Sequence, residues 1–283
     1  MTRKSTPIKK IRSTYKSATN DNITVSGTEF VETSMARKIF NACEFARESK
    51  KPVFVIGKSQ IGKTWALRHY AATHPNTVFC SMEPGMAFKK LVMHIGKAIG
   101  CKADSVEDMR EAIHATLHAN TVLIIDEMHL LCHTLHRSKF LACVEFIRRI
   151  GDNTGAGLVL CGTKLFDSSL EARIELEQIR KRGVHSYPLP DAPYAADVRL
   201  IVEASGLAWA QSGEPVTVEG KTEKPYALLK SLAHNDGLTA ITERIRYARK
   251  FATRAKQPLS WAHFVEAHLL INNSKTLEPT GWK

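Results

Sequence analysis

The first two thirds of the chain contain four short, predominantly apolar runs separated by segments with helical periodicity. The apolar runs cover residues 52–56, 77–80, 120–125 and 157–163. A continuous apolar run rich in β-branched residues predicts a strand that is buried on both faces, as in a parallel sheet covered by helices. Because strands and helices alternate, the sequence predicts an α/β fold in which a parallel sheet is flanked by helices.

The helical patterns fall into two groups. One group accompanies the apolar runs, at residues 30–50, 65–72, 86–95 and 106–118, and the other follows them, at 195–210, 226–234, 238–255 and 261–271. The turn-forming stretch 187–193 between the groups has the composition of a domain boundary. We therefore predict a basic flexible arm at 1–24, a main α/β domain at 25–188, a small helical domain at 189–272 and a tail at 273–283.

The segment directly after the first apolar run matches the pattern G-x-x-x-x-G-K-[ST]. Its residues are Gly57, Lys58, Ser59, Gln60, Ile61, Gly62, Lys63 and Thr64. Glycines let backbone N–H groups close around phosphate oxygens, and the helix that follows points its positive N-terminus at the same anion. The pattern predicts a phosphate-binding loop for a nucleotide, with Lys63 reaching the β- and γ-phosphates and Thr64 binding Mg²⁺.

An acidic pair, Asp126 and Glu127, comes directly after the third apolar run. We expect Asp126 to hold Mg²⁺ through water and Glu127 to polarise the attacking water. Successive side chains on a strand diverge, so one carboxylate can face the metal while the other faces the γ-phosphate. Such a pair alone is typical of an ordinary turn; the complete phosphate loop upstream is what favours ATP hydrolysis.

Two further segments carry candidate chemistry. Thr163 ends the fourth apolar run and is placed for a polar residue between the acidic pair and the γ-phosphate, with a simple strand-end threonine as the alternative. Residues 177–183 form a basic turn that contains Arg180 and Arg182. Supplied across a subunit boundary, such an arginine would stabilise transition-state charge as arginine fingers do. Taken alone, the turn is better explained as basic residues that complement a helix dipole.

Charge extends the prediction to partners. The 283 residues include 40 Lys and Arg against 28 Asp and Glu, which gives a formal net charge of +12. A balance of this kind concentrates polyanions at a surface, so nucleic acid is the first partner to consider. The candidate contacts to duplex DNA are the N-terminal arm, Lys89, Lys90, Arg137 and Lys139, although each charge taken singly is more often a solvated surface group. Without a motif for base readout, we expect sequence-tolerant, salt-dependent contacts to phosphates.

Other sequence features narrow the class of protein. The six cysteines are scattered through apolar segments, which is typical of buried free thiols in a reducing compartment. No run approaches the ~18 apolar residues of a membrane span, and the N-terminus lacks the apolar stretch of a signal peptide, so we expect a cytoplasmic protein with no membrane partner. His129, Cys132, His133 and His136 have helical spacing, but no carboxylate-anchored zinc motif accompanies them, which makes zinc the weaker interpretation.

The order of these motifs resembles that of the AAA+ ATPases, and more narrowly that of the transposition regulators related to the phage Mu B protein, TnsC, TniB and IstB. The resemblance is carried by the loop at 57–64, the D-E-x-H segment at 126–129, Cys161-Gly162-Thr163 at the place of sensor I, and residues 178–182, which resemble the Q-L-R-x-R arginine-finger segment. It spans about residues 25–260. It implies an AAA+ P-loop domain with a small C-terminal helical lid.

The resemblance also implies roles for single residues. It makes Lys63 and Thr64 ligands of ATP and Mg²⁺, Asp126 the magnesium organiser, Glu127 the hydrolytic base and Thr163 the sensor. For the arginine finger it favours Arg182, with Arg180 as the second choice.

The chain departs from the family pattern in the lid. Where related lids often carry a sensor II arginine after a glycine, this chain has Gly237-Leu238-Thr239-Ala240-Ile241. Arg244 or Arg246 on the same helix could substitute, or lid sensing could be weak.

Three functional hypotheses follow. The first is an ATPase that regulates DNA transposition: its subunits assemble with ATP into a ring or helical filament on duplex DNA, select the target, and recruit or activate a transposase. The second is a helicase loader or initiator-like AAA+ ATPase whose partner is a helicase. The third is a nucleotide-gated interaction switch that hydrolyses ATP poorly. The motif set and the basic charge, together with the resemblance, favour the first.

Overall fold

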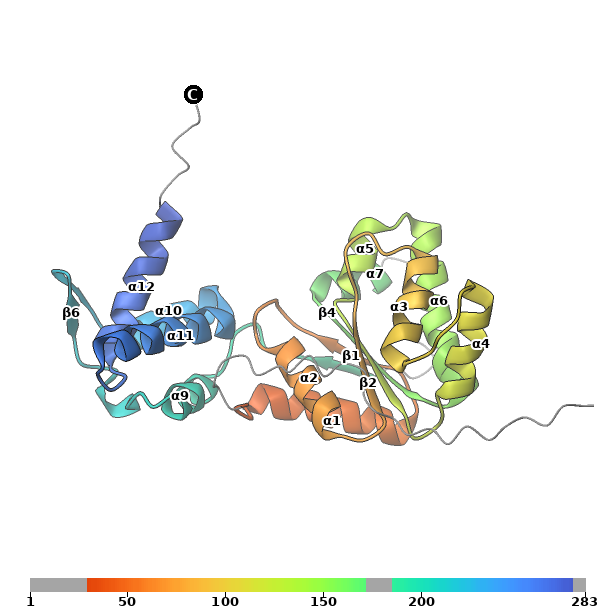
Figure 1. Cartoon of the computed structure of the whole chain (residues 1–283), viewed down its shortest axis with the longest axis horizontal. Helices are drawn as coiled ribbons and strands as arrows, with labels where there is room; N and C mark the ends of the chain where they lie inside the picture. The colour runs from red at the N-terminus through yellow and green to blue at the C-terminus, as the bar shows by residue number, and fades with distance from the viewer. Residues whose placement is uncertain (1–29, 172–184, 277–283) are drawn as a thin grey trace, which may run out of the picture.

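A five-stranded parallel sheet lies at the centre of the main domain in the computed structural model, which describes residues 30–171 and 185–276 (Figure 1). The strands are β1 (Val53–Ile56), β2 (Thr77–Ser81), β3 (Val122–Asp126), β4 (Gly157–Gly162) and β5 (His185–Pro188), in the order β2-β3-β4-β1-β5. Every neighbouring pair is parallel. The loop after β1 therefore starts inside the sheet, between the ends of β4 and β5.

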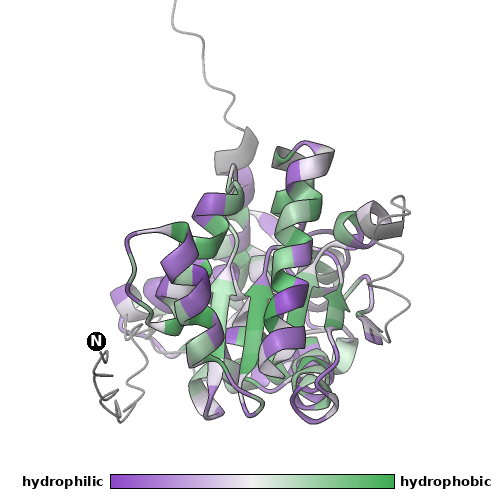
Figure 2. Cartoon of the chain, turned by 90° about the vertical axis from the view of Figure 1, so that its right-hand side faces the viewer, coloured by the Kyte–Doolittle hydropathy of each residue, from purple (hydrophilic) through white to green (hydrophobic). Residues whose placement is uncertain are grey.

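Helices cover both faces of the sheet. One face carries α1 (Ser34–Ser49) and α2 (Lys63–Thr73), and the other carries α3 (Phe88–Ile99), α4 (Val106–Thr116) and α6 (Arg137–Thr154). Side chains alternate between the two faces along each strand, and β1 shows this. Val53 and Val55 pack against α1 and α2, whereas Phe54 and Ile56 belong to the buried cluster on the side of α3, α4 and α6. Figure 2 shows hydrophobic strands at the centre and helices of mixed hydrophobic and hydrophilic residues around them.

Two short helices begin near the carboxyl edge of the sheet. They are α5 (His129–Thr134), which follows β3, and α7 (Lys164–Glu171), which follows β4, and they contact each other. The segments that follow β3 and β4 are therefore held together beside the phosphate loop.

The C-terminal part of the chain forms a separate helical lid (Figure 1). It contains α9 (Ala195–Ala204), the short η2 (Trp209–Gln211), an antiparallel hairpin of β6 (Val216–Val218) and β7 (Lys221–Glu223), α10 (Pro225–Asn235), α11 (Gly237–Ala255) and α12 (Trp261–Thr276). A buried cluster of its own, which includes Val202, Ile241 and Phe264, holds these elements together.

Several elements of the structure differ from the sequence prediction. Strand β5 was not predicted because its residues are largely exposed at the sheet edge and form no apolar run. The helix expected at 195–210 ends as α9 at Ala204, and Gly206 turns the chain with φ 94°. The hairpin of β6 and β7 was not predicted either, since its short strands are polar and exposed.

The predicted boundaries can be compared only in part. Helix α12 continues to Thr276, so the boundary predicted at residue 272 falls inside it. The N-terminal arm at 1–24, residues 277–283 and both candidate finger arginines, Arg180 and Arg182, lie outside the described residues. Among the described residues, no helix is long and apolar enough to cross a membrane.

Candidate nucleotide-binding site

The phosphate-loop segment, residues 57–64, connects β1 to α2. The Gly57 N–H donates to the Gly162 carbonyl at 3.2 Å, which ties the start of the loop to β4. A Cβ atom on Gly57 would lie 2.8 Å from Ile61 Cδ1 and 3.0 Å from Leu189 Cβ, so these neighbours would have to shift. Gly62 has φ 94°, a conformation that favours glycine. Gly62 is therefore favoured by the backbone conformation, and Gly57 by the close packing of side chains around it.

Lys63 is the first residue of α2 and is only 7% exposed. Its ammonium group donates to the carbonyl oxygens of Gly57 at 3.0 Å and of Lys58 at 2.5 Å. A buried ammonium needs such acceptors to offset the loss of hydration. The two carbonyls thus hold a positive charge inside the loop at a helix N-terminus, an arrangement suited to an anion.

A hydrogen bond joins the phosphate loop to the end of β3. Thr64 Oγ1 donates to Asp126 Oδ2 at 2.6 Å, and Asp126 Oδ1 accepts the Glu127 N–H at 2.8 Å. Asp126 is 1% exposed, so these donors satisfy oxygens that water does not reach. A hydroxyl and a carboxylate offer the oxygen ligands that Mg²⁺ prefers. The residues present therefore fit a magnesium ion held together with nucleotide phosphates.

Glu127 follows Asp126 in an uncommon backbone conformation. Its φ is 60°, in the left-handed region that non-glycine residues seldom adopt and that recurs at functional sites. Its Oε2 lies 3.3 Å from Nδ1 of His129, and its side chain is 36% exposed. The two carboxylates therefore diverge, with Asp126 bonded to Thr64 and Glu127 paired with His129. The role of Glu127 as the hydrolytic base remains a prediction.

Thr163 directly follows β4, close to the acidic pair. The Met128 N–H donates to the Cys161 carbonyl at 2.9 Å, so the segment after β3 is bonded to the end of β4. Burial, and to a smaller extent the charge of Asp126, raise the pKa of the Cys161 thiol well above its ordinary value, which keeps a neutral group beside that carboxylate. Thr163 is half-buried, and its role as a sensor remains a prediction.

The lid arginines that could replace sensor II differ in their surroundings. Arg244 is 2% exposed and donates to the Ala240 carbonyl at 2.9 Å and to Nδ1 of His268 at 3.1 Å. These bonds keep its guanidinium inside the lid, which argues against Arg244 as a phosphate ligand. Arg246 lies 3.8 Å from the carboxylate of Glu243 and lines a cavity between the lid and the main domain.

The candidate DNA contacts lie on neighbouring helices. Lys89 and Lys90 are exposed in the first turn of α3, and Lys139 is exposed in the first turn of α6. The two helices cover the same face of the sheet. Arg137 begins α6, but its side chain lies outside the part of the chain that the structure describes. Contact with DNA remains a prediction for all four residues.

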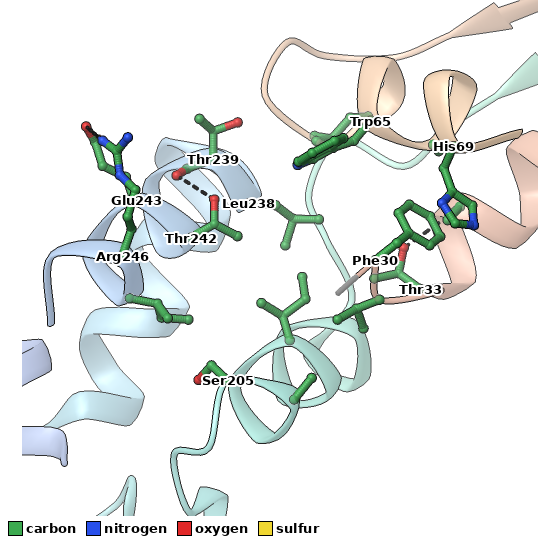
Figure 3. A pocket seen from close by; sticks show the side chains of 18 of the residues that line it. Phe30, Thr33, Trp65, His69, Ser205, Leu238, Thr239, Thr242, Glu243 and Arg246 are labelled. Carbon is green, nitrogen blue, oxygen red and sulfur yellow. Dashed lines mark hydrogen bonds and ion pairs between the residues drawn. The ribbon is translucent and has the colours of Figure 1, made fainter. Parts of the chain in front are cut away.

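A cavity of about 1130 Å³ lies beside the phosphate loop, between α1 and α2 of the main domain and α9 and α11 of the lid. Ile61 and Gly62 bring the loop into its wall. Trp65 from α2 and Leu238 from α11 also line it (Figure 3). On another part of the wall, Phe30 stacks on His69 with ring centroids 3.7 Å apart.

Sequence reasoning missed two residues around this cavity. Trp65 was assigned only to the helix after the loop, yet its side chain is 45% exposed and lines the cavity. An exposed tryptophan directly after the motif Thr64 is a signal that could have been used. Asp197 in α9 is 1% exposed and accepts two hydrogen bonds from Ser34. No local pattern distinguishes Asp197 from other acidic residues in a first helical turn.

Comparison with known proteins agrees with this geometry. Residues 46–170 match a family model described as an AAA domain. The chain is 28% identical over 145 residues to the Mu-like prophage FluMu DNA transposition protein B of Haemophilus influenzae, a match that covers 49% of this chain and 47% of that protein. It is 26% identical over 226 residues to the ATP-dependent target DNA activator B of Escherichia phage Mu, with 75% of this chain and 67% of that protein covered.

The chain thus spans about half the length of the Haemophilus relative. Among solved structures, a Walker-type ATPase of Pyrococcus abyssi has a TM-score of 0.53 at 11% identity, over 88% of this chain and 75% of that chain. A likeness at such low identity concerns the fold alone, a parallel α/β sheet with flanking helices. Residues 46–170 thus form an AAA domain, and the chain is similar to transposition proteins of the Mu B type.

Proposed function

We propose that this protein is an ATP-dependent, DNA-binding regulator of DNA transposition. In this proposal it assembles with ATP on duplex DNA as a ring or helical filament, selects the target and recruits or activates a transposase. The observation that carries the proposal is the 2.6 Å hydrogen bond between Thr64 and Asp126, which makes the phosphate loop and the acidic strand end one site. The similarity to an ATP-dependent target DNA activator supports the choice of process.

The phosphates of ATP bind at the loop. Lys63 exchanges the carbonyls of Gly57 and Lys58 for phosphate oxygens, which are charged and therefore stronger acceptors. The sugar and base extend into the neighbouring cavity, where Trp65 and Leu238 offer apolar surface for a flat ring.

Hydrolysis then depends on the residues that follow β3. Thr64 and Asp126 hold Mg²⁺, which supplies charge neutralisation to the phosphates when it is bound. The half-exposed carboxylate of Glu127 accepts a proton from the attacking water. Arg182 or Arg180 of an adjacent subunit completes the site, so turnover and assembly depend on each other.

Binding to DNA follows from charge. The excess of basic residues gives a net charge of +12, and the exposed lysines Lys89, Lys90 and Lys139, with Arg137, lie at the beginnings of neighbouring helices. Contacts to phosphates release counterions, so the affinity falls steeply as salt is raised. Because phosphate contacts do not read the bases, the protein would select targets with many different DNA sequences.

One observation favours a second function, a nucleotide-gated interaction switch with little turnover. Oε2 of Glu127 lies 3.3 Å from Nδ1 of His129, and an ion pair there would occupy the carboxylate that has to act as a base. In such a switch, ATP binding without hydrolysis changes the surface through which this protein binds its partner.

ATP hydrolysis and sedimentation, measured with and without duplex DNA across a salt series, separate the two functions. The regulator predicts turnover and large assemblies that need both ATP and DNA, and it predicts that Glu127→Gln blocks turnover but keeps the assemblies. The exposed lid substitution Glu219→Gln is the control and behaves as wild type. ATP-dependent assembly with near-zero turnover in wild type favours the switch. A protein that remains monomeric and indifferent to DNA contradicts the regulator.

A further inference from the structure

The first turn of α11 touches the phosphate loop. The Thr239 N–H donates to the Gln60 carbonyl at 3.3 Å, and the Thr239 hydroxyl lies 3.4 Å from the same oxygen. Leu238 is close to the loop as well, because a Cβ atom on Gly62 would lie 3.6 Å from Leu238 Cδ1. The lid is therefore bonded directly to the segment that would surround the phosphates.

Gly237 allows this approach. A Cβ atom at this position would lie 2.6 Å from the Gln60 carbonyl oxygen and 3.0 Å from its carbonyl carbon, which are backbone atoms that cannot rotate away. Gly237 also has φ 74°, a conformation that strains other residues. Any side chain here would push α11 and the phosphate loop apart.

The other partner in this contact, Gln60, is itself in an uncommon conformation. It has φ 65°, although it is not a glycine. In a trans peptide the carbonyl of one residue points opposite to the N–H of the next. Fixing the direction of the Gln60 carbonyl therefore also fixes the direction of the Ile61 N–H, one of the loop N–H groups available to a phosphate.

The two candidate lid arginines make contacts within the lid, and Arg246 also lines the cavity. Arg244 is bonded inside the lid to Ala240 and His268. Arg246 lies 3.8 Å from the carboxylate of Glu243 and 5.3 Å from the ring centroid of Tyr247. The contacts with the loop come instead from the backbone and hydroxyl of the first turn of α11.

We propose that Gly237 and Thr239 are positioning residues that couple the lid to the phosphate loop, in place of an arginine that would contact the phosphate itself. The inference rests on the nucleotide binding proposed above. The hydrogen bonds from Thr239 to the Gln60 carbonyl keep the loop in the conformation that binds phosphate. Phosphate bound at the loop in turn stabilises the contact between the lid and the main domain.

The test compares two glycine substitutions with nearly equal backbone strain. Gly237→Ala adds a methyl group against Gln60, whereas Gly220→Ala, at φ 76° in the turn between β6 and β7, adds one where no atom lies within 4 Å. Calorimetric titration with ADP and Mg²⁺ is expected to show roughly tenfold weaker binding for Gly237→Ala, which corresponds to the loss of a few contacts. Gly220→Ala is expected to bind as wild type does.

Threonine substitutions test the hydrogen bond itself. Thr239→Val is expected to weaken ADP binding about threefold, as for one solvent-accessible hydrogen bond, and Thr239→Ser to restore it. Thr73 is the control, since it is another exposed helical threonine whose hydroxyl bonds within its own helix, to the His69 carbonyl at 2.8 Å, and it does not line the cavity. Thr73→Val is expected to leave affinity unchanged.

Hydrogen exchange measures whether ADP binding changes the first turn of α11. A purely structural role of Gly237 would not alter this ADP-dependent change. ADP is expected to slow amide exchange in the first turn of α11 in wild type, and this effect is lost in Gly237→Ala at a temperature where that variant is still folded. If wild type binds ADP but Gly237→Ala binds it equally well, the coupling is wrong and the proposed function stands. If wild type does not bind ADP, the proposed function fails and the coupling fails with it.

Discussion

The carboxylate of Asp197 in α9 accepts two hydrogen bonds from Ser34, the first residue of α1. Both are 2.7 Å long, one from the backbone N–H and one from the hydroxyl. The N–H groups at a helix start have no partner inside the helix, and a negative charge there is favoured by the helix dipole. These two hydrogen bonds join the lid to the main domain beside the cavity. They are a second connection, separate from the contact between α11 and the phosphate loop.

We expect Ser34→Ala to destabilise the protein by about 1–3 kcal/mol, although most exposed substitutions have little effect. The reason is that Asp197 is 1% exposed and would lose a donor in a place that water reaches poorly. Urea unfolding measures the change. Ser168→Ala, an exposed serine whose hydroxyl bonds to the Leu165 carbonyl of its own helix, is the control. Equal stability of the two variants would contradict the interpretation.

The ammonium group of Lys63 predicts a selective loss of nucleotide binding. Lys63→Ala removes the buried positive charge at the loop, whereas Lys58→Ala removes an exposed one from the same segment. We expect ATP affinity to fall at least about tenfold for Lys63→Ala, since a charged hydrogen bond contributes roughly 1.5–3 kcal/mol. Calorimetry with ATP and Mg²⁺ checks this. Comparable affinities of both variants would place the nucleotide elsewhere.

Trp65 predicts an optical signal for nucleotide binding. Its side chain is 45% exposed and lines the cavity, so a bound base would cover it and change its fluorescence. We expect Trp65→Phe to abolish most of the change caused by ATP and to weaken binding only a few-fold, because an aromatic ring remains. Trp209→Phe, in the lid but outside the cavity lining, is expected to keep the signal. A signal that survives Trp65→Phe would argue against a base in this cavity.

Gly57 predicts a coupled loss of stability and binding. Gly57→Ala would place its Cβ 2.8 Å from Ile61 Cδ1 and 3.0 Å from Leu189 Cβ, so the side chains around it or the loop itself have to shift. Overpacking of this kind costs about 1–3 kcal/mol. Thermal unfolding and ATP titration should both show the effect. Gly213→Ala, where no atom lies within 4 Å of the added Cβ, is the comparison, and an equal effect there would refute steric crowding as the cause.

A surface network in α6 predicts sensitivity to acid. Arg148 donates to Glu145 at 2.8 Å, and this hydrogen bond lowers the pKa of Glu145 from 4.5 to about 2. Because the folded state holds this proton less tightly than the unfolded state, the stabilisation is present above pH 4.5 and is lost as the pH falls toward 2. Glu145→Gln should therefore be less stable than wild type at neutral pH, and the difference should shrink through this window. Thermal unfolding across the pH series measures it, and a constant difference would contradict the assignment.

The sequence by itself determined the α/β fold class and the candidate phosphate site. Buried strands such as β3 and β4 need continuous apolar residues, which remain visible without coordinates. The loop at 57–64 is equally visible because close packing favours glycine at Gly57, a positive φ favours it at Gly62, and the chemistry requires Lys63 and Thr64. These requirements are local, so they leave a fixed spacing in the chain.

Only the tertiary structure decided which distant groups meet. Strand β5 is recognisable through its pairing with β1, since its own residues are exposed and carry no apolar signal. The hydrogen bonds between Thr239 and Gln60, and between Asp197 and Ser34, join residues far apart in the sequence. Threonine, serine and aspartate are common surface residues, and their role here comes from the packing of the lid against the main domain, which no local pattern encodes.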